Sequence, residues 1–76
     1  MAKSKVDVLH QHIISELKRY RKEKGLSHQK LADLAGVTRP AISFLESGKR
    51  NPSLLLCLKL CEAMKTDFSE LLTQNR

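Results

Sequence analysis

Apolar residues recur every three or four positions through the first third of the chain. They are Val6, Leu9, Ile13, Leu17 and Tyr20. This spacing places their side chains on one side of a helix. We therefore expect a helix from near Val6 to Lys24 that stops at Gly25, because glycine readily adopts the left-handed conformation that ends many helices. Residues 1–5 lack the pattern and are expected to form a disordered N-terminal tail.

The stretch from Ser27 to Pro52 predicts two short helices joined by a tight turn. The first helix carries its apolar residues at helical spacing, at Leu31, Leu34 and Ala35. Ser27 is placed to cap its N-terminus, and Gly36 can form the turn without steric cost. Thr38 offers a second N-cap hydroxyl, so we expect the second helix at about residues 39–47. Short helices linked in this way are typical of a helix-turn-helix.

Two more helices are expected after Pro52. Ser53 is the expected N-cap of the first, which should run to Met64. Its expected core face is Leu54, Cys57, Leu58 and Cys61, with Leu60 and Met64 beside it. Leu55 and Leu56 extend the apolar surface almost all round this helix, as in a helix that is covered on more than one side. Asp67 and Glu70 have the spacing of a capping box and predict a last short helix through Leu71 and Leu72.

Charge and length narrow the classes of function. The chain has 76 residues and a net charge of +6, and its Lys and Arg residues are concentrated in the first two thirds. A domain of this size buries a small core and has little room for an enclosed active site. A basic surface suits a polyanion, most simply nucleic acid.

The sequence does not support a membrane protein, a metal-binding protein or an enzyme. The longest apolar run, Leu54 to Leu58, is far shorter than a membrane span, so we expect a soluble, cytoplasmic protein with no membrane partner. Cys57 and Cys61 point the same way on one helix and are expected to be reduced core residues, with neither a disulfide nor a metal between them. No phosphate-binding glycine loop or Ser/His/Asp arrangement is present. We therefore expect no enzyme activity and no cofactor.

The run from Gly25 to Ser53, GLSHQKLADLAGVTRPAISFLESGKRNPS, resembles the lambda-repressor/Cro-like helix-turn-helix (XRE) family, and weaker similarity extends from about Ile13 to Leu72. The resemblance implies an all-α fold, a compact five-helix bundle at residues 6–73 followed by a C-terminal tail at 74–76. It also implies a homodimer that binds a two-fold symmetric, double-stranded DNA operator through a helix in the major groove. We expect a sequence-specific transcriptional repressor. The alternative is an antitoxin with a toxin partner, or another protein-interaction module of the same fold, in which DNA reading is secondary or lost.

Four residues on the outward face of the second short helix are candidates for reading bases: Arg39, Pro40, Ser43 and Phe44. Arg39 is the strongest, since a guanidinium can donate two hydrogen bonds to guanine O6 and N7. Contact with a phosphate is its alternative role. For Phe44, contact with thymine methyl groups and packing along the edge of the preceding helix remain equally open.

The residues expected to bind DNA phosphates flank that helix. They are His28, Gln29, Thr38, Lys49, Arg50 and Asn51. His28 and Gln29 begin the preceding helix, where the helix dipole favours an anion. The family commonly has glutamine at the position of His28, so histidine is a departure that allows a pH-dependent contact.

The resemblance also assigns two structural roles. Arg21 and Glu46 match a family ion pair that holds the second short helix against the first helix of the domain. Leu55 and Leu56 are usually polar positions in the family, so we expect them to form a dimer interface together with Phe68 and Leu72.

Overall fold

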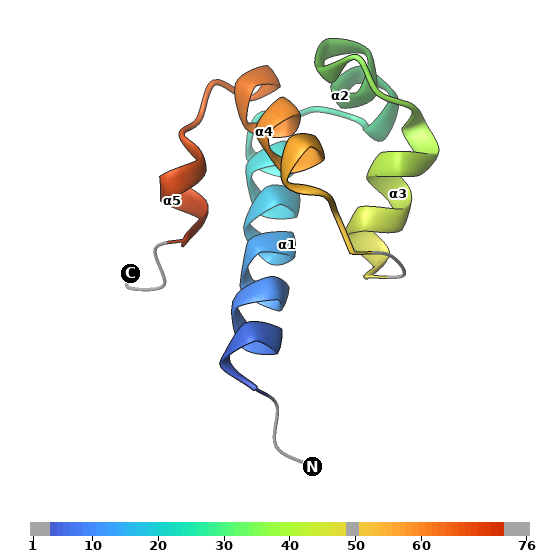
Figure 1. The fold of residues 1–76 in the computed structure, drawn as a ribbon. Coiled ribbons are helices and arrows are strands. Elements are labelled where there is room, and N and C mark those ends of the chain that lie inside the picture. Colours follow the sequence, from blue (N-terminus) through green and yellow to red (C-terminus); the bar gives the residue numbers. More distant parts are fainter. Residues whose placement is uncertain (1–3, 49–50, 73–76) are drawn as a thin grey trace.

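A computed structural model of the protein describes residues 4–48 and 51–72, and these residues form five helices. The helices are α1 (Lys5–Glu23), α2 (His28–Ala35), α3 (Arg39–Ser47), α4 (Leu54–Ala63) and α5 (Phe68–Leu72). Figure 1 shows α1 as the long central element, with the other helices packed around its C-terminal half and its first turns extending beyond them. The described residues are all helix, turn or loop, so the expected all-α five-helix bundle is confirmed.

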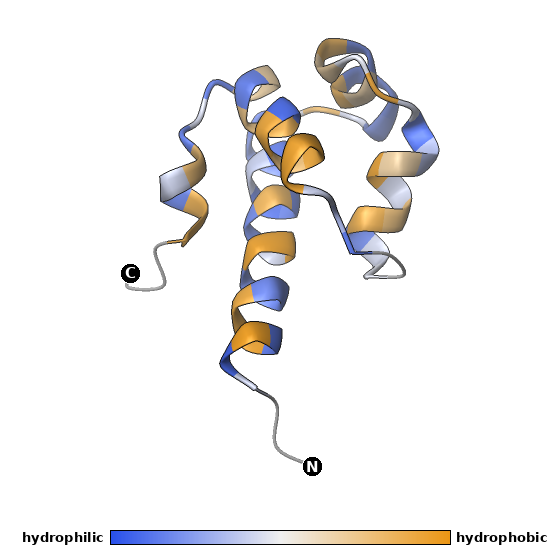
Figure 2. Ribbon diagram, in the orientation of Figure 1, coloured by the Kyte–Doolittle hydropathy of each residue, from blue (hydrophilic) through white to orange (hydrophobic). Residues whose placement is uncertain are grey.

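The core lies where α1, α2, α3, α4 and α5 meet. Its fully buried large side chains come from every helix and are Leu17, Leu31, Ile42, Leu45, Leu60, Met64 and Leu71. Helix α3 packs on α2 and α1, while α4 packs on α2 and α5. Burying one such side chain contributes about 1.5–3 kcal/mol, so this small set dominates the stability of the bundle. Figure 2 shows hydrophobic segments, in orange, on the helices and a continuous hydrophobic stretch at the start of α4.

Side-chain caps begin the first four helices. The hydroxyl groups of Ser27, Thr38 and Ser53 accept hydrogen bonds from the third residue after each, at 3.0, 3.3 and 3.0 Å. These three predicted caps are confirmed. The Glu70 carboxylate accepts from the Asp67 N–H at 3.4 Å, which forms one half of the predicted capping box.

Ser4 and Lys5, expected in the N-terminal tail, belong to the start of α1. Ser4 caps α1 by accepting a hydrogen bond from Asp7 N at 3.1 Å, and Lys5 is already helical. A serine hydroxyl at this point satisfies a free N–H of the first turn. This cap is a polar signal, so the apolar periodicity of the helix does not indicate it. Residues 1–3 and 73–76 lie outside the described part of the chain, as does the expected C-terminal tail.

The expected stripe on α1 is correct only in its second half. Leu17 is buried and Tyr20 is partly buried, but Val6 is 75% exposed because the first turns of α1 extend past the other helices. Ile14 is buried instead. A stripe on a helix contributes to the core only where another element covers it.

Two helices turn a different side inward from the one their apolar spacing indicated. In α2 the small residue Ala32 is fully buried, whereas Leu34 is half exposed. In α4 the buried residues are Cys57, Leu60, Cys61 and Met64, while Leu54 and Leu58 are exposed. The two possible stripes on α4 share both cysteines. The spacing of apolar residues along α4 therefore does not determine which of the two stripes faces the core. Packing of α4 against α2 and α5 determines it.

Gly36 adopts the left-handed conformation that the turn between α2 and α3 requires, with φ of +70°. We expect Gly36→Ala to lower the free energy of unfolding by about 1–2 kcal/mol, because an L side chain is strained in this conformation. A Cβ at this position would have no atom within 4 Å, so the cost arises from the backbone and not from a clash. Urea denaturation measures the effect. Gly36→Asn is the matched control and should cost less, since asparagine tolerates this conformation; an equal loss in both variants would contradict the explanation.

Candidate nucleic-acid interface

Helices α2 and α3 form the two arms of a helix-turn-helix. Helix α2 ends at Ala35, and the backbone N–H groups of Gly36 and Val37 both donate to the carbonyl of Ala32. These two hydrogen bonds fix the turn that precedes Thr38, the N-cap of α3. The arms lie against each other, and α3 runs along the outside of the bundle (Figure 1).

The inner face of α3 is anchored in the core. Ile42 and Leu45 are buried, as predicted, and Val37 packs beside them at the edge of the core. Arg39 and Pro40 at the start of the helix are exposed. Helix α3 is thus fixed by one side and presents its N-terminal turn to solvent.

The ion pair expected between α1 and α3 is present. Arg21 donates from Nε to Glu46 Oε2 at 2.6 Å and from Nη2 to Glu46 Oε1 at 3.0 Å. Its third nitrogen group donates to the Leu26 carbonyl at 2.7 Å. The two side chains are only 11% and 7% exposed. A guanidinium paired through two parallel bonds fixes direction as well as distance, so this pair sets the orientation of α3 on α1.

Hydrogen bonding keeps Glu46 ionised despite its burial. Burial by itself raises the pKa of this carboxyl group, but hydrogen bonds from Arg21 and His28 and their positive charge outweigh it. The resulting pKa lies below its ordinary value of 4.5. Glu46 is therefore a carboxylate at neutral pH and acts only as an acceptor.

His28 lies between the ion pair and the outer face of α3. Its Nε2 is 3.1 Å from Glu46 Oε1, and its Nδ1 is 3.4 Å from Ser43 Oγ. Both ring nitrogens therefore face protein partners. The sequence indicated a phosphate contact for His28; that role stays a prediction, and the structure adds a second role in which the ring supports α3.

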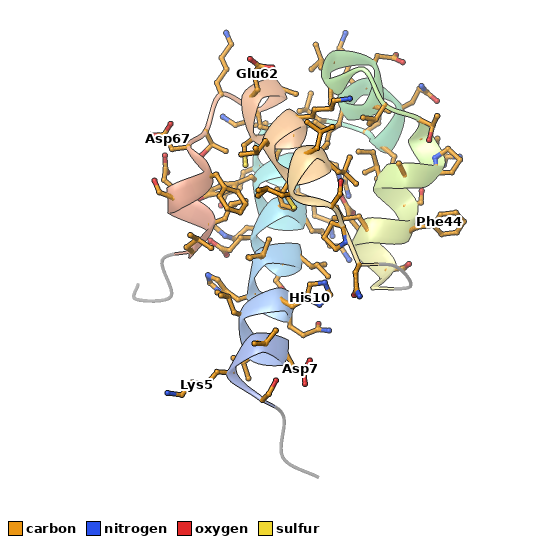
Figure 3. The ribbon with its side chains drawn as sticks, in the orientation of Figure 1. Lys5, Asp7, His10, Phe44, Glu62 and Asp67 are labelled. Carbon is orange, nitrogen blue, oxygen red and sulfur yellow. The ribbon has the colours of Figure 1, made fainter. Side chains whose placement is uncertain are left out.

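The outward residues of α3 do not all face the same way. Ser43 is half-buried beside His28, whereas Figure 3 shows the Phe44 ring pointing away from the bundle. Phe44 also lines a pocket with Pro52 and Leu56, next to the start of α4. Of the two alternatives for Phe44, contact with thymine methyl groups stays a prediction. Packing along the edge of α2 also stays a prediction. The pocket lies between α3 and the start of α4, a neighbourhood that the sequence did not suggest.

Basic side chains of α1 lie next to α3. Lys18 and Lys22 line one open hollow together with Arg21, His28, Ser43, Glu46 and Ser47. Arg19 differs from them, because it pairs with Glu16 at 2.8 Å and with Glu23 at 2.7 Å. Lys18 and Lys22 were not assigned to the site from the sequence. Their i, i+4 spacing around Arg21, which pairs with α3, was the signal that could have placed them there.

The remaining predicted phosphate contacts are only partly described. Gln29 is exposed and donates to Asp33 Oδ1 at 2.9 Å, and Asn51 is exposed after α3. The Thr38 hydroxyl serves as the cap of α3. Lys49 and Arg50 lie outside the described residues, and their role stays a prediction.

Comparison with known proteins identifies the family. The model of the helix-turn-helix family matches residues 17–71. The regulator YgzD of Bacillus subtilis, named as an uncharacterized HTH-type transcriptional regulator, is 38% identical over 56 residues, which cover 74% of this chain and 85% of YgzD. An uncharacterized HTH-type transcriptional regulator of Methanothermobacter thermautotrophicus is 39% identical over 54 residues, 71% of this chain and 78% of the relative.

Two solved structures share the fold. The restriction-modification controller protein C.AhdI from Aeromonas hydrophila has a TM-score of 0.76 and 37% identity, and the match covers 86% of this chain and 97% of that one. The N-terminal DNA-binding domain of SinR from Bacillus subtilis has a TM-score of 0.78 and 34% identity, with 88% and 99% covered. The chain belongs to the XRE-type helix-turn-helix family. It is a DNA-binding transcriptional regulator of that family, whose members are not enzymes.

The cysteines and histidines in the described part of this XRE domain are not arranged as a metal site. Cys57 and Cys61 are free and buried, and burial raises the pKa of Cys61 to about 11. A thiol that stays protonated is a poor metal ligand. Among the residues that the structure describes, no three His, Cys, Asp or Glu side chains are grouped closely enough to hold a metal ion. None of the helices within 4–48 and 51–72 combines the length and apolar character needed to cross a membrane.

Several leucines of α4 are exposed in this XRE domain. Leu54 and Leu55 are 62% and 61% exposed, and Leu58 is also exposed. Of the four residues expected at a dimer interface, Leu55 and Leu72 are exposed, whereas Leu56 and Phe68 pack partly against the core. Sequence reasoning placed Leu54 and Leu58 on the wrong side of α4 and so left them out of this surface.

Proposed function

We propose that the protein is a transcriptional repressor that binds a two-fold symmetric operator as a homodimer, with α3 in the major groove. The observation that supports this most is the exposed N-terminal turn of α3. Arg39 and Pro40 lie there, on a helix whose other side is fixed by Ile42, Leu45 and the Arg21–Glu46 pair. A rigid helix with an exposed guanidinium at its start is suited to reading guanine through two hydrogen bonds.

The phosphate contacts in this proposal lie on both sides of α3. Lys18 and Lys22 lie on the α1 side, next to the start of α2 where Gln29 is exposed. Asn51, with Lys49 and Arg50 before it in the sequence, follows the other end of α3. Cations that flank a base-reading helix fix its register on DNA but carry no sequence information themselves.

The exposed leucines of α4 supply the dimer interface in this proposal. Leu54, Leu55 and Leu58 form an apolar surface at the N-terminal end of α4, and Leu72 adds an exposed leucine from α5. In this proposal, pairing through the α4 surface leaves the Arg39 turn of α3 free to bind DNA. A two-fold dimer places two copies of α3 about one DNA turn, roughly 34 Å, apart.

A gel-shift assay with genomic fragments and a salt series tests the DNA-binding role. We expect specific binding that weakens steeply as salt rises, because each neutralised phosphate releases counterions. Failure to bind any fragment specifically at low salt would favour the alternative, a protein-interaction module with this fold. The likeness to a restriction-modification controller protein supports a regulatory role. A toxin, phage genes, or an endonuclease with its methyltransferase beside the gene would each select one biological role.

The double substitution Leu55→Asp with Leu58→Asp should produce a folded monomer. Each charge replaces an exposed leucine, so the core is untouched, while two leucines per subunit lose their partner surface. We expect the dissociation constant of the dimer to rise by at least roughly 100-fold, and the affinity for the operator to fall with it. Sedimentation velocity measures the change. Leu34→Asp, at an exposed leucine of α2, is the control and should leave the dimer intact; an intact dimer in the double variant would place the interface elsewhere.

A further inference from the structure

One chain of polar contacts joins the outer face of the recognition helix to its buried anchor. It runs from Ser43 Oγ to His28 Nδ1 at 3.4 Å, from His28 Nε2 to Glu46 Oε1 at 3.1 Å, and from Glu46 to Arg21. Ser43 belongs to the predicted base-reading set, while Glu46 is almost fully buried. His28 is 29% exposed and connects the two.

The direction of these hydrogen bonds follows from the chemistry of each group. The Glu46 carboxylate can only accept, so His28 Nε2 must carry a hydrogen. In a neutral imidazole the other nitrogen then has none and can only accept. The Ser43 hydroxyl therefore donates its hydrogen inward to Nδ1. On the side that faces DNA, Ser43 is left with oxygen lone pairs and acts as an acceptor.

Protonation of His28 reverses one of these bonds. The imidazolium has a hydrogen on both nitrogens, so Nδ1 becomes a donor to Ser43 Oγ while Nε2 still donates to Glu46. The Ser43 hydrogen can then rotate outward. On the side that faces DNA, the same hydroxyl becomes a donor.

Among the described residues, the charged groups that line the hollow around the ring come from α1 and α3. From α1, Lys18, Arg21 and Lys22 line the same hollow, and from α3 Glu46 does so. Arg21 is committed to Glu46 and the Leu26 carbonyl. Histidine is the side chain that most often serves as a pH-dependent switch in proteins.

We propose that His28 determines specificity by setting, through its protonation state, whether Ser43 accepts or donates a hydrogen bond at the base pair it meets. This inference rests on the proposed function, in which α3 enters the major groove. With neutral His28, Ser43 favours a base that donates there, such as cytosine through its N4 amino group. With protonated His28, Ser43 favours guanine, which offers only the O6 and N7 acceptors. A glutamine at position 28 has no such titration.

Operator variants measure the effect on DNA. The base pair that meets Ser43 is found as the one at which Ser43→Ala alters preference, and operators with C·G or G·C there are compared by fluorescence anisotropy at pH 5.5 and 8.0. We expect the ratio of the two affinities to shift by about three- to tenfold toward guanine at the lower pH, the factor of one hydrogen bond. His28→Gln and Ser43→Ala should abolish the shift, and His12→Gln should retain it.

The free protein provides a test that does not depend on DNA. Nitrogen-15 NMR of the imidazole rings, with His28→Gln to assign the signals, should show His28 hydrogen on Nε2 in the neutral state. A neutral ring with its hydrogen on Nδ1 would overturn the inference, as would a preference that is independent of pH or that still shifts in Ser43→Ala. Absence of specific binding at both pH values would instead overturn the proposed function.

Discussion

Glu46→Gln is expected to lower the free energy of unfolding by roughly 3 kcal/mol or more, a large part of the stability of a domain this small. The substitution preserves shape but removes the charge that compensates Arg21. The guanidinium is only 11% exposed, so it would remain buried with the Leu26 carbonyl as its main partner. Removing one partner of a buried pair costs more than the pair itself contributes, because the remaining charge is left without compensation. Urea denaturation measures the loss.

Two comparisons make the Glu46 experiment specific. Glu23→Gln breaks the exposed Arg19–Glu23 pair and should cost less than about 1 kcal/mol. The double variant Arg21→Met with Glu46→Leu should recover much of the loss, since apolar residues of similar volume often replace a buried pair without penalty. If Glu46→Gln costs no more than Glu23→Gln, the pair does not anchor α3.

The same carboxylate predicts how stability changes with pH. The folded-state pKa of Glu46 lies below its ordinary value of 4.5, so the folded state favours the ionised form. Its contribution is fully present above pH 4.5 and is lost as the pH falls through the lower, folded-state pKa. The free energy of unfolding should therefore decline more steeply with acid in the natural protein than in Glu46→Gln. Parallel curves for the two proteins would contradict this assignment.

Arg39→Ala is expected to have the largest effect of a single substitution on DNA recognition. Loss of a guanidinium that contacts guanine should cost about 1–3 kcal/mol in each half-site, and the preference at that base pair should relax. Arg39 is exposed at the start of α3, so the fold should be unchanged. Binding to the operator and to its single-base variants, measured by fluorescence anisotropy, gives both the affinity and the preference.

Matched variants separate base reading from charge in the Arg39 experiment. Arg39→Lys keeps the charge but loses the two-pronged geometry, so it should retain non-specific binding without restoring the preference. Lys22→Ala, on α1, should weaken all DNA sequences alike and reduce the salt slope by about 0.9 per subunit. An unchanged sequence preference in Arg39→Ala would assign Arg39 to a phosphate.

Local features of the fold were readable from the sequence because they depend on neighbouring residues. Ser27, Thr38 and Ser53 each precede a helix whose free N–H groups their hydroxyls satisfy. Gly36 supplies a backbone conformation that other residues resist. The pattern of these residues was also specific enough to identify the XRE family, and through it the Arg21–Glu46 pair.

Features that depend on which surfaces meet were decided by the tertiary structure. The sequence of α4 is apolar on nearly every side, so the choice to bury Leu60 and Met64 and expose Leu54 and Leu58 came from packing against α2 and α5. His28 meets Ser43 and Glu46 only because α2 folds back on α3, across 15 and 18 residues of chain. The sequence by itself determined the helices, the caps at Ser27, Thr38 and Ser53, and the turn at Gly36. Only the fold placed a titratable ring between the buried anchor of α3 and the face proposed to read bases, because that contact requires side chains distant in sequence to share one hollow.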